Sequence, residues 1–192
     1  LTQNDLKANK PIVLFFGGSQ GAKSINTSLM QIIGKKQNKN YQIMWAAGPA
    51  QYEEIKFTLK REYSLTIENI PNVKIVPYIY NMEEMMNLVD LVVARSGAMT
   101  ITEIANVGKP AIFIPFPFAT ENHQEYNAKV LEKIGAAKMI LDKDLNAKNL
   151  NQTIENLVQD KKKLKQMGEK ARSISISQVE QKIYEEIRNV VK

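Results

Sequence analysis

Short apolar runs alternate with helical patterns along most of the sequence, and this alternation restricts the fold more than any other feature. Strands that alternate with helices require right-handed crossovers, and they therefore build a parallel sheet with helices on both faces. We expect strands at residues 12–16, 42–46, 73–76, 91–94, 111–114 and 138–141, with helices at residues 23–33, 50–63, 82–88, 99–106 and 124–134. The sequence thus predicts an α/β fold.

The simplest arrangement of these elements is a Rossmann-like, doubly wound six-stranded parallel sheet in the order 3-2-1-4-5-6. In that order the chain reverses direction between strands 1 and 4, and ligands bind beyond the carboxyl ends of those two strands. Gly108 and Pro110 predict a helix end before strand 5. After residue 142 we expect a helical tail at residues 146–159, 161–171 and 177–191, whose last helix packs on this sheet or reaches a second domain.

Composition bounds the class of protein. The 192 residues are 44% apolar without a clear internal break, which predicts a single domain over residues 1–192. The absence of cysteine excludes disulfides and thiolate metal sites and favours a reducing compartment. We expect neither a signal peptide nor a membrane span, because residues 1–10 are polar and no apolar run is long enough.

The chain carries a formal net charge of +6, part of which lies at Lys35, Lys36 and residues 161–165. Such lysine runs are most often solvated helix ends, and the second interpretation is that they bind an anionic membrane surface. Nucleic acid is the least favoured partner because no aromatic residue interleaves with the lysines.

Glycine-rich turns follow expected strands 1 and 4, at residues 17–21 and 95–100. Each leads into the first turn of a helix, where unpaired backbone N–H groups and the positive helix end attract an anion. Because the predicted topology independently brings both turns to one crevice, we predict a divided site for a diphosphate-bearing ligand. For the first turn, a tight structural turn capped by Ser19 is the alternative.

Competing motifs fit less well. A P-loop would need glycine where Ala22 stands, and a dinucleotide fingerprint fails because strand 2 ends without an acidic residue. Asp142 and Asp144 have the spacing of a metal-binding D-x-D motif, but they follow strand 6, which we expect to lie away from the switch point. We therefore predict a turn and helix cap there, with no metal and no cofactor.

The second turn leads into a helix with further candidate residues. If this helix begins near Gly97, Ser96 is its cap, while Thr100 and Glu103 share one face. Glu103 is either an ordinary solvated glutamate or a carboxylate that accepts two ribose hydroxyls. Arg95 is either a surface or ion-paired residue, or it approaches the phosphates.

The loop after strand 5 ends in Asn122, His123 and Gln124, which bring hydrogen-bonding groups to the next helix start. This cluster is suited to reading sugar hydroxyls. His123 is the only histidine, so a histidine-rich metal site and a histidine acid–base pair are both excluded. A surface or capping role for His123 is equally open.

These segments resemble the carboxyl-terminal, donor-binding half of the MurG family of bacterial glycosyltransferases. The resemblance rests on residues 17–22, on residues 94–103, and on His123, Gln124, Asn127 and Ala128. It runs from about residue 11 to the end of the chain, and its Arg-Ser-Gly-Ala-x-Thr-x-x-Glu segment is specific within the GT-B superfamily. The resemblance implies one half of a GT-B fold that binds UDP-N-acetylglucosamine, the donor for inverting transfer to undecaprenyl-pyrophosphoryl-N-acetylmuramyl pentapeptide.

The resemblance also implies roles for individual residues. Glu103 would hold the ribose, the backbone of Ile79 the uracil beside Met82, and Gln124 with His123 the sugar. Ser19 and Thr100 would bind the diphosphate together with backbone amides of the two turns. The expected substrate-binding residues are Gly18, Ser19, Gln20, Ile79, Met82, Arg95, Ala98, Met99, Thr100, Glu103, His123 and Gln124.

The amino-terminal domain of that family has no counterpart in this sequence. In the family it carries the site for the lipid-linked acceptor, the membrane-facing patch and the presumed base. Residues 1–10 would then be a linker remnant, and residues 177–192 a helix that crosses to the other domain. We expect a fragment that is inactive alone and whose enzyme acts in the cytoplasm at the inner membrane face, with only indirect membrane association. The alternatives are a non-catalytic nucleotide-sugar-binding subunit and, more distantly, a P-loop-like nucleoside triphosphatase.

Overall fold

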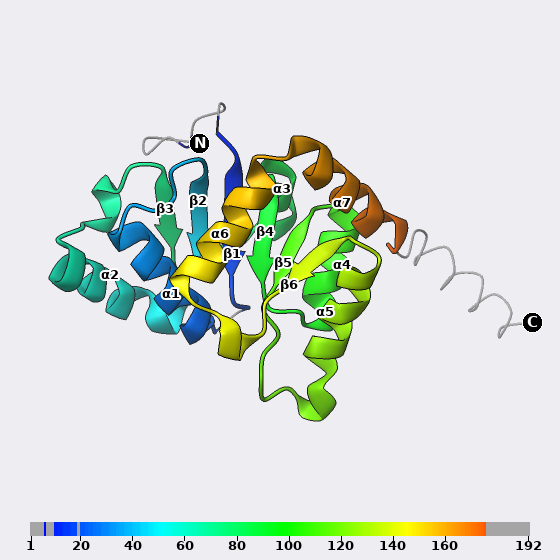
Figure 1. Cartoon of the computed structure of the whole chain (residues 1–192). Coiled ribbons are helices and arrows are strands. Elements are labelled where there is room, and N and C mark those ends of the chain that lie inside the picture. Colours follow the sequence, from blue (N-terminus) through cyan, green and yellow to red (C-terminus); the bar gives the residue numbers. More distant parts are fainter. Residues whose placement is uncertain (1–5, 7–9, 19, 176–192) are drawn as a thin grey trace, which may run out of the picture.

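The six predicted strands form one parallel sheet in the computed structural model, which describes residues 6, 10–18 and 20–175 (Figure 1). Their order is β3-β2-β1-β4-β5-β6, as predicted, and every neighbouring pair is parallel. The strands are β1 (Ile12–Phe16), β2 (Gln42–Ala46), β3 (Val73–Val76), β4 (Leu91–Ala94), β5 (Ala111–Phe113) and β6 (Ala137–Met139). The first four have the predicted bounds, whereas β5 and β6 end earlier than expected.

In the described part of the chain, seven α-helices cover the two faces of this sheet. Figure 1 shows α6 and α1 in front of the strands and α4 and α5 behind them. No helix boundary differs from its predicted position by more than two residues, and the predicted helix at residues 177–191 lies outside the described residues. The helices are α1 (Lys23–Gly34), α2 (Pro49–Tyr63), α3 (Met82–Leu88), α4 (Ala98–Val107), α5 (His123–Lys133), α6 (Ala147–Val158) and α7 (Lys161–Ser173).

Alternate residues of the central strands divide between two hydrophobic cores. Val13 and Phe15 pack in the core shared with α1, α2 and α6, whereas Leu14 and Phe16 pack in the core shared with α3, α4 and α5. Because the central strands are buried on both faces, β1, β4 and β5 are continuous apolar runs rather than alternating ones, whereas the edge strands β3 and β6 each contain a lysine. This explains why short uninterrupted runs identified the strands.

A buried polar chain connects the first core to the first glycine turn. The Trp45 indole N–H donates to Asn26 Oδ1 at 2.9 Å, and Asn26 Nδ2 donates to the carbonyl of Ala47 at 2.8 Å and to Gln51 Oε1 at 3.0 Å. Gln51 Nε2 in turn donates to the carbonyl of Gln20 at 3.2 Å. These bonds satisfy the polar groups of the core and hold the glycine turn against the end of β2.

The predicted helix end before strand 5 is confirmed. Gly108 adopts the left-handed conformation with φ 69°, and its N–H donates to the carbonyls of Ile104 and Ala105. Glycine reaches this conformation without the steric cost that other residues meet. The chain then turns into β5 through Pro110.

Candidate functional site

The two glycine turns lie side by side at the carboxyl ends of β1 and β4, which are hydrogen-bonded neighbours. They line one crevice of about 560 Å³, together with the loop that follows β5. The sequence-based prediction that both turns meet at the switch point is therefore confirmed. Of the predicted binding residues, those that line this crevice are Gly18, Arg95, Thr100 and Gln124.

The first turn packs closely against the end of β2. Gly21 has φ +79°, and a Cβ atom placed on it would lie 2.4 Å from the carbonyl oxygen of Ala47. Gly18 has φ +84°, but a Cβ there would have no atom within 4 Å. The N-cap position of α1 is Ala22, without a side-chain cap or an acidic residue in the first turn. Ala22 rather than Ser19 therefore occupies the cap position, and Ser19 itself lies outside the described residues.

This difference between two glycines gives a direct test of the turn. We expect Gly21→Ala to lower the free energy of unfolding by about 1–3 kcal/mol more than Gly18→Ala, because overpacking adds to the positive-φ cost that both variants share. Urea unfolding followed by the fluorescence of Trp45 measures both variants. Equal destabilisation would contradict the close approach of Gly21 to Ala47.

The second turn begins α4 differently from the prediction. The predicted cap at Ser96 is wrong, because the N-cap is Gly97 and α4 starts at Ala98 with no side-chain cap. Ser96 is fully buried, and its hydroxyl donates to the carbonyl of Gln124 at 2.8 Å. The serine thus joins the second turn to the start of α5, and it leaves the first N–H groups of α4 without a side-chain acceptor.

The predicted placement of Asp142 away from the switch point is also wrong. Asp142 lines the crevice, and its Oδ1 accepts from Arg95 Nη1 at 2.5 Å and from the Ser24 hydroxyl at 2.7 Å. The reason lies in the tertiary packing. Because α6 packs beside α1, the chain that leaves β6 crosses the carboxyl edge of the sheet toward the start of α1 (Figure 1). The predicted turn is confirmed as a 3₁₀ turn, but the cap of α6 is Asn146.

Arg95 forms an ion pair with Asp142, which is one of the two interpretations that the sequence left open. Its side chain is only 12% exposed, and Nη1 also donates to the carbonyls of Ile114 and Pro115 at 3.0 Å each. The Arg95 guanidinium lies 5.6 Å from the centroid of the Phe116 ring, within cation–π range. A contact of Arg95 with phosphate stays a prediction.

Several predicted residues lie outside the residues that line this crevice. Glu103 is exposed on α4, Ile79 is buried after β3, and Met82 is half-buried at the start of α3. His123 is exposed, with Nδ1 2.7 Å from the carbonyl oxygen of Thr120. Gln20, Ala98 and Met99 are exposed near the two turns. The binding roles of all these residues remain predictions.

The crevice residues that sequence reasoning missed include Ser24, Phe116 and Phe118, in addition to Asp142. Ser24 lies at the start of the helix predicted at residues 23–33, and nothing in the sequence connects it to Asp142, which lies 118 positions further along the chain. Phe116 and Phe118 also line the crevice, with ring centroids 5.7 Å apart in an edge-to-face arrangement. Phe118 is 84% exposed, which is unusual for a phenylalanine. The alternation of Pro115, Phe116, Pro117 and Phe118 was the signal in the sequence that could have identified them.

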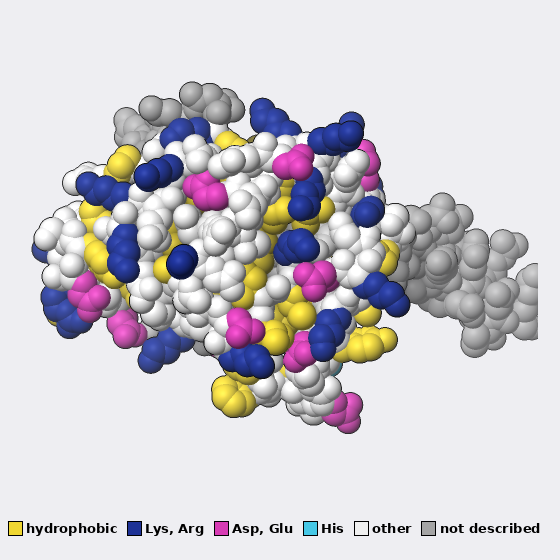
Figure 2. All heavy atoms as spheres, in the orientation of Figure 1, with side chains coloured by type: hydrophobic (Ala, Val, Ile, Leu, Met, Phe, Trp, Pro, Cys, Tyr) yellow, Lys and Arg dark blue, Asp and Glu magenta, His cyan; other side chains and the backbone are white. Residues whose placement is uncertain are grey.

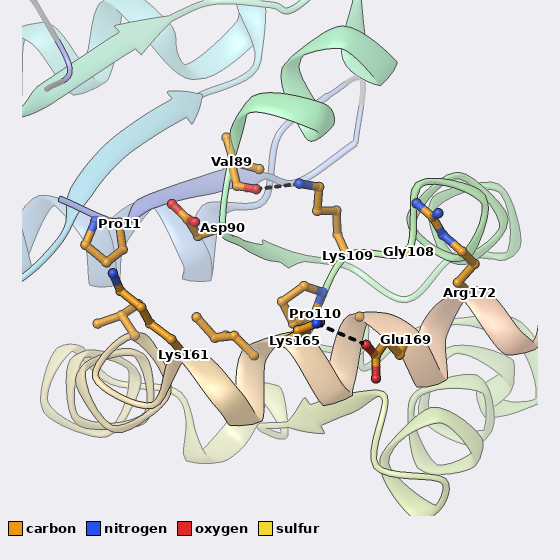
Figure 3. Close-up of a pocket in the computed structure, with 13 residues that line it drawn as sticks. Pro11, Val89, Asp90, Gly108, Lys109, Pro110, Lys161, Lys165, Glu169 and Arg172 are labelled. Atoms are coloured by element: carbon orange, nitrogen blue, oxygen red, sulfur yellow. Dashed lines mark hydrogen bonds and ion pairs between the residues drawn. The ribbon is translucent and has the colours of Figure 1, made fainter. Parts of the chain in front are cut away.

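A second hollow of about 490 Å³ lies at the opposite, amino-terminal edge of the sheet (Figure 3). Two of the charged side chains that line it bind backbone groups. Lys109 Nζ donates to the carbonyls of Asn87 and Val89 at the end of α3, and burial lowers the Lys109 pKa. Asp90 accepts from the Ile12 N–H at 2.8 Å. We therefore regard the crevice at the glycine turns as the candidate site.

The two lysine runs do not mark a second candidate site. The lysines of the two runs, Lys35, Lys36 and residues 161–163 and 165, are exposed on α1, its end and α7, as predicted for solvated lysines. Figure 2 shows Lys and Arg side chains dispersed over one face among acidic ones. Among the residues that the structure describes, no group of three or more histidine or carboxylate side chains could hold a metal ion. Within the same residues, no helix combines the length and hydrophobicity of a membrane span.

Comparison with known proteins matches residues 12–186 to the glycosyltransferase family 28 C-terminal domain. A UDP-N-acetylglucosamine–N-acetylmuramyl-(pentapeptide) pyrophosphoryl-undecaprenol N-acetylglucosamine transferase from Acetivibrio thermocellus is 40% identical over 95% of this chain and 48% of its own length. The transferase of the same name from Desulforamulus reducens is 43% identical over 88% of this chain and 45% of its own length. The crystal structure of Acinetobacter baumannii MurG superposes with a TM-score of 0.80 and 32% identity, covering 95% of this chain and 51% of that one. The chain thus spans about half the length of the relatives that it matches.

Proposed function

The chain belongs to the family of glycosyltransferase family 28 C-terminal domains, and from this we propose that it binds a UDP-sugar in the crevice between its two glycine turns. The observation that supports this most is the meeting of the starts of α1 and α4 at one crevice. Neither helix start has a side-chain cap or an acidic residue in its first turn. Backbone N–H groups at two such helix starts suit a diphosphate.

The proposed sugar nucleotide is UDP-N-acetylglucosamine, and the proposed enzyme is a peptidoglycan precursor transferase. The relatives that match the chain are named for transfer of N-acetylglucosamine to a pyrophosphoryl-undecaprenol acceptor. Since this chain spans about half of their length, we propose that the other half binds the acceptor, supplies the base and contacts the membrane. Such an enzyme would work at the cytoplasmic face of the plasma membrane.

The chemistry proposed for this chain is electrostatic. As the sugar leaves the nucleotide, negative charge develops on the departing diphosphate. Helix starts and amides that are already oriented stabilise such charge without reorganisation. Gln124 is proposed to bind the sugar through its Nε2 donors. The Phe116 N–H, which donates to Gln124 Oε1 at 3.0 Å, supports this because it orients the amide. Glu103 is proposed to hold the ribose.

Calorimetry of the chain against UDP, UDP-N-acetylglucosamine and ATP tests this proposal. We expect both UDP ligands to bind, and a chelator to change the UDP affinity by less than about twofold, because helix ends and amides supply the compensating charge. Failure of UDP to bind would contradict the proposal. A preference for ATP, or a requirement for Mg²⁺ or Mn²⁺, would favour a nucleoside triphosphatase instead.

The alternative function is that of a non-catalytic subunit, which would bind the nucleotide sugar in the same crevice. Calorimetry alone does not separate it from half of a transferase, since both bind the donor. Reconstitution of transfer with the amino-terminal half of a relative, described in the Discussion, distinguishes the two.

A further inference from the structure

Asp142 and Arg95 join four segments at the carboxyl edge of the sheet. The Asp142 carboxylate follows β6, and the Arg95 guanidinium follows β4. Asp142 Oδ1 accepts from Ser24 at the start of α1, and Arg95 Nη2 donates to the same Ser24 hydroxyl at 3.0 Å. Arg95 Nη1 donates to the carbonyls of Ile114 and Pro115 after β5. Each partner therefore depends on the others for its orientation.

The next residue along the loop connects this cluster to Gln124. Phe116 lies under the Arg95 guanidinium, and its backbone N–H donates to Gln124 Oε1. Because Arg95 holds the two carbonyls immediately before Phe116, it sets where this N–H points. A continuous series of contacts thus runs from Asp142 through Arg95 and Phe116 to the Gln124 amide.

The Asp142 carboxylate is a negative charge in a crevice that is proposed to bind a negatively charged diphosphate. Among the described residues, the charged side chains that line the crevice are Lys23, Arg95 and Asp142. A carboxylate beside a site for a diphosphate opposes binding of that anion. Asp142 also pairs with the guanidinium that would otherwise be free for the phosphates. A role in orienting Arg95 and the loop after β5 explains why a carboxylate lies at this position.

We propose that Asp142 is a positioning residue for sugar recognition: it holds Arg95 so that the loop at residues 114–118 presents Gln124 to the sugar of the donor. This rests on the proposed function. It also predicts that a change at Asp142 affects sugar binding more than nucleotide binding, because Asp142 is proposed to act on Gln124 and not on the residues that bind the diphosphate. Loss of Asp142 should impair recognition of the sugar more than recognition of UDP.

The test compares Asp142→Asn with the matched control Asp144→Ala, which removes a carboxylate from the same 3₁₀ turn. Calorimetry measures the affinity of each variant for UDP and for UDP-N-acetylglucosamine. We expect Asp142→Asn to weaken UDP-N-acetylglucosamine binding by at least about fivefold more than UDP binding, as one lost charge-assisted hydrogen bond would. We expect Asp144→Ala to leave the ratio of the two affinities within about twofold of its starting value.

The outcomes separate the inference from the proposed function. Equal weakening of both ligands by Asp142→Asn, or no change in either, overturns the positioning role. If Asp142→Asn does not fold, Ser24→Ala replaces it, since that variant removes one partner of Oδ1 and keeps both charges. A shift of the affinity ratio in the same direction supports the inference, and an unchanged ratio overturns it. If the unmodified chain binds neither UDP ligand, the proposed function itself fails.

Discussion

The chain alone is expected to bind UDP-N-acetylglucosamine and to transfer none of it to a lipid-linked acceptor. Glycosyl transfer needs an acceptor hydroxyl close to the anomeric carbon and a base to take its proton, and such positioning accounts for much of the rate. In the proposed function, the crevice would form one wall of such a site, and the other half of the enzyme would form the other. His123, the only histidine, is exposed, and its Nδ1 lies beside the Thr120 carbonyl.

Transfer of labelled N-acetylglucosamine to a short-chain lipid acceptor measures this prediction. Steady turnover by the chain alone would show that the catalytic machinery has been misplaced. The matching amino-terminal half of a relative, added in trans, is the companion experiment. Recovery of transfer would favour half of a transferase, whereas binding without any recovery would favour a separate nucleotide-sugar-binding subunit.

Replacement of Glu103 by alanine is expected to weaken UDP binding by about 10- to 150-fold, the effect of losing charge-assisted bonds to the ribose hydroxyls. Glu103 is exposed on α4, one turn beyond the uncapped helix start, so its removal should leave the fold intact. Calorimetry with UDP gives the affinity, and thermal unfolding checks the fold.

Glu54→Ala is the matched control for Glu103→Ala, because Glu54 is an exposed glutamate on α2. It should leave UDP affinity within about twofold, since a distant surface charge is screened by solvent and salt. A folded Glu103→Ala variant with unchanged UDP affinity would remove the ribose role. An equal loss in Glu54→Ala would mean that net charge, rather than ribose contact, governs binding.

The strands and helices were predictable because each is specified by residues near one another in the chain. The residues from Ile12 to Phe16 form an apolar run, as expected for a central strand that is buried on both faces. Along this run, successive side chains pack alternately in the first and the second hydrophobic core. Gly108 and Pro110 ended α4 through local backbone chemistry. The strand order followed from the alternation and the handedness of crossovers, and it brought both glycine turns to one crevice.

The side-chain partners in the crevice were less predictable. Ser96 has the residue type and position of a helix cap, yet its hydroxyl bonds to the carbonyl of Gln124 on α5. Local preference favoured the cap, but the packing of α5 beside the second turn gives the buried Ser96 hydroxyl a backbone acceptor at 2.8 Å. Similarly, the sequence left open whether Arg95 forms an ion pair or approaches the phosphates. The structure shows the ion pair with Asp142, and the phosphate contact stays a prediction.

The residue pattern alone specified the α/β class, the strand order and the crevice at the switch point. Periodicity and turn chemistry depend on residues that are close in the sequence, and the right-handed crossover is common to nearly all parallel sheets. The cluster of Ser24, Arg95 and Asp142 depended on the folded chain. Ser24 and Asp142 are 118 positions apart in the sequence. They meet because α6 packs beside α1, and that contact carries the segment after β6 across the edge of the sheet. Such packing depends on how the surfaces of two distant helices fit together, which no local pattern records.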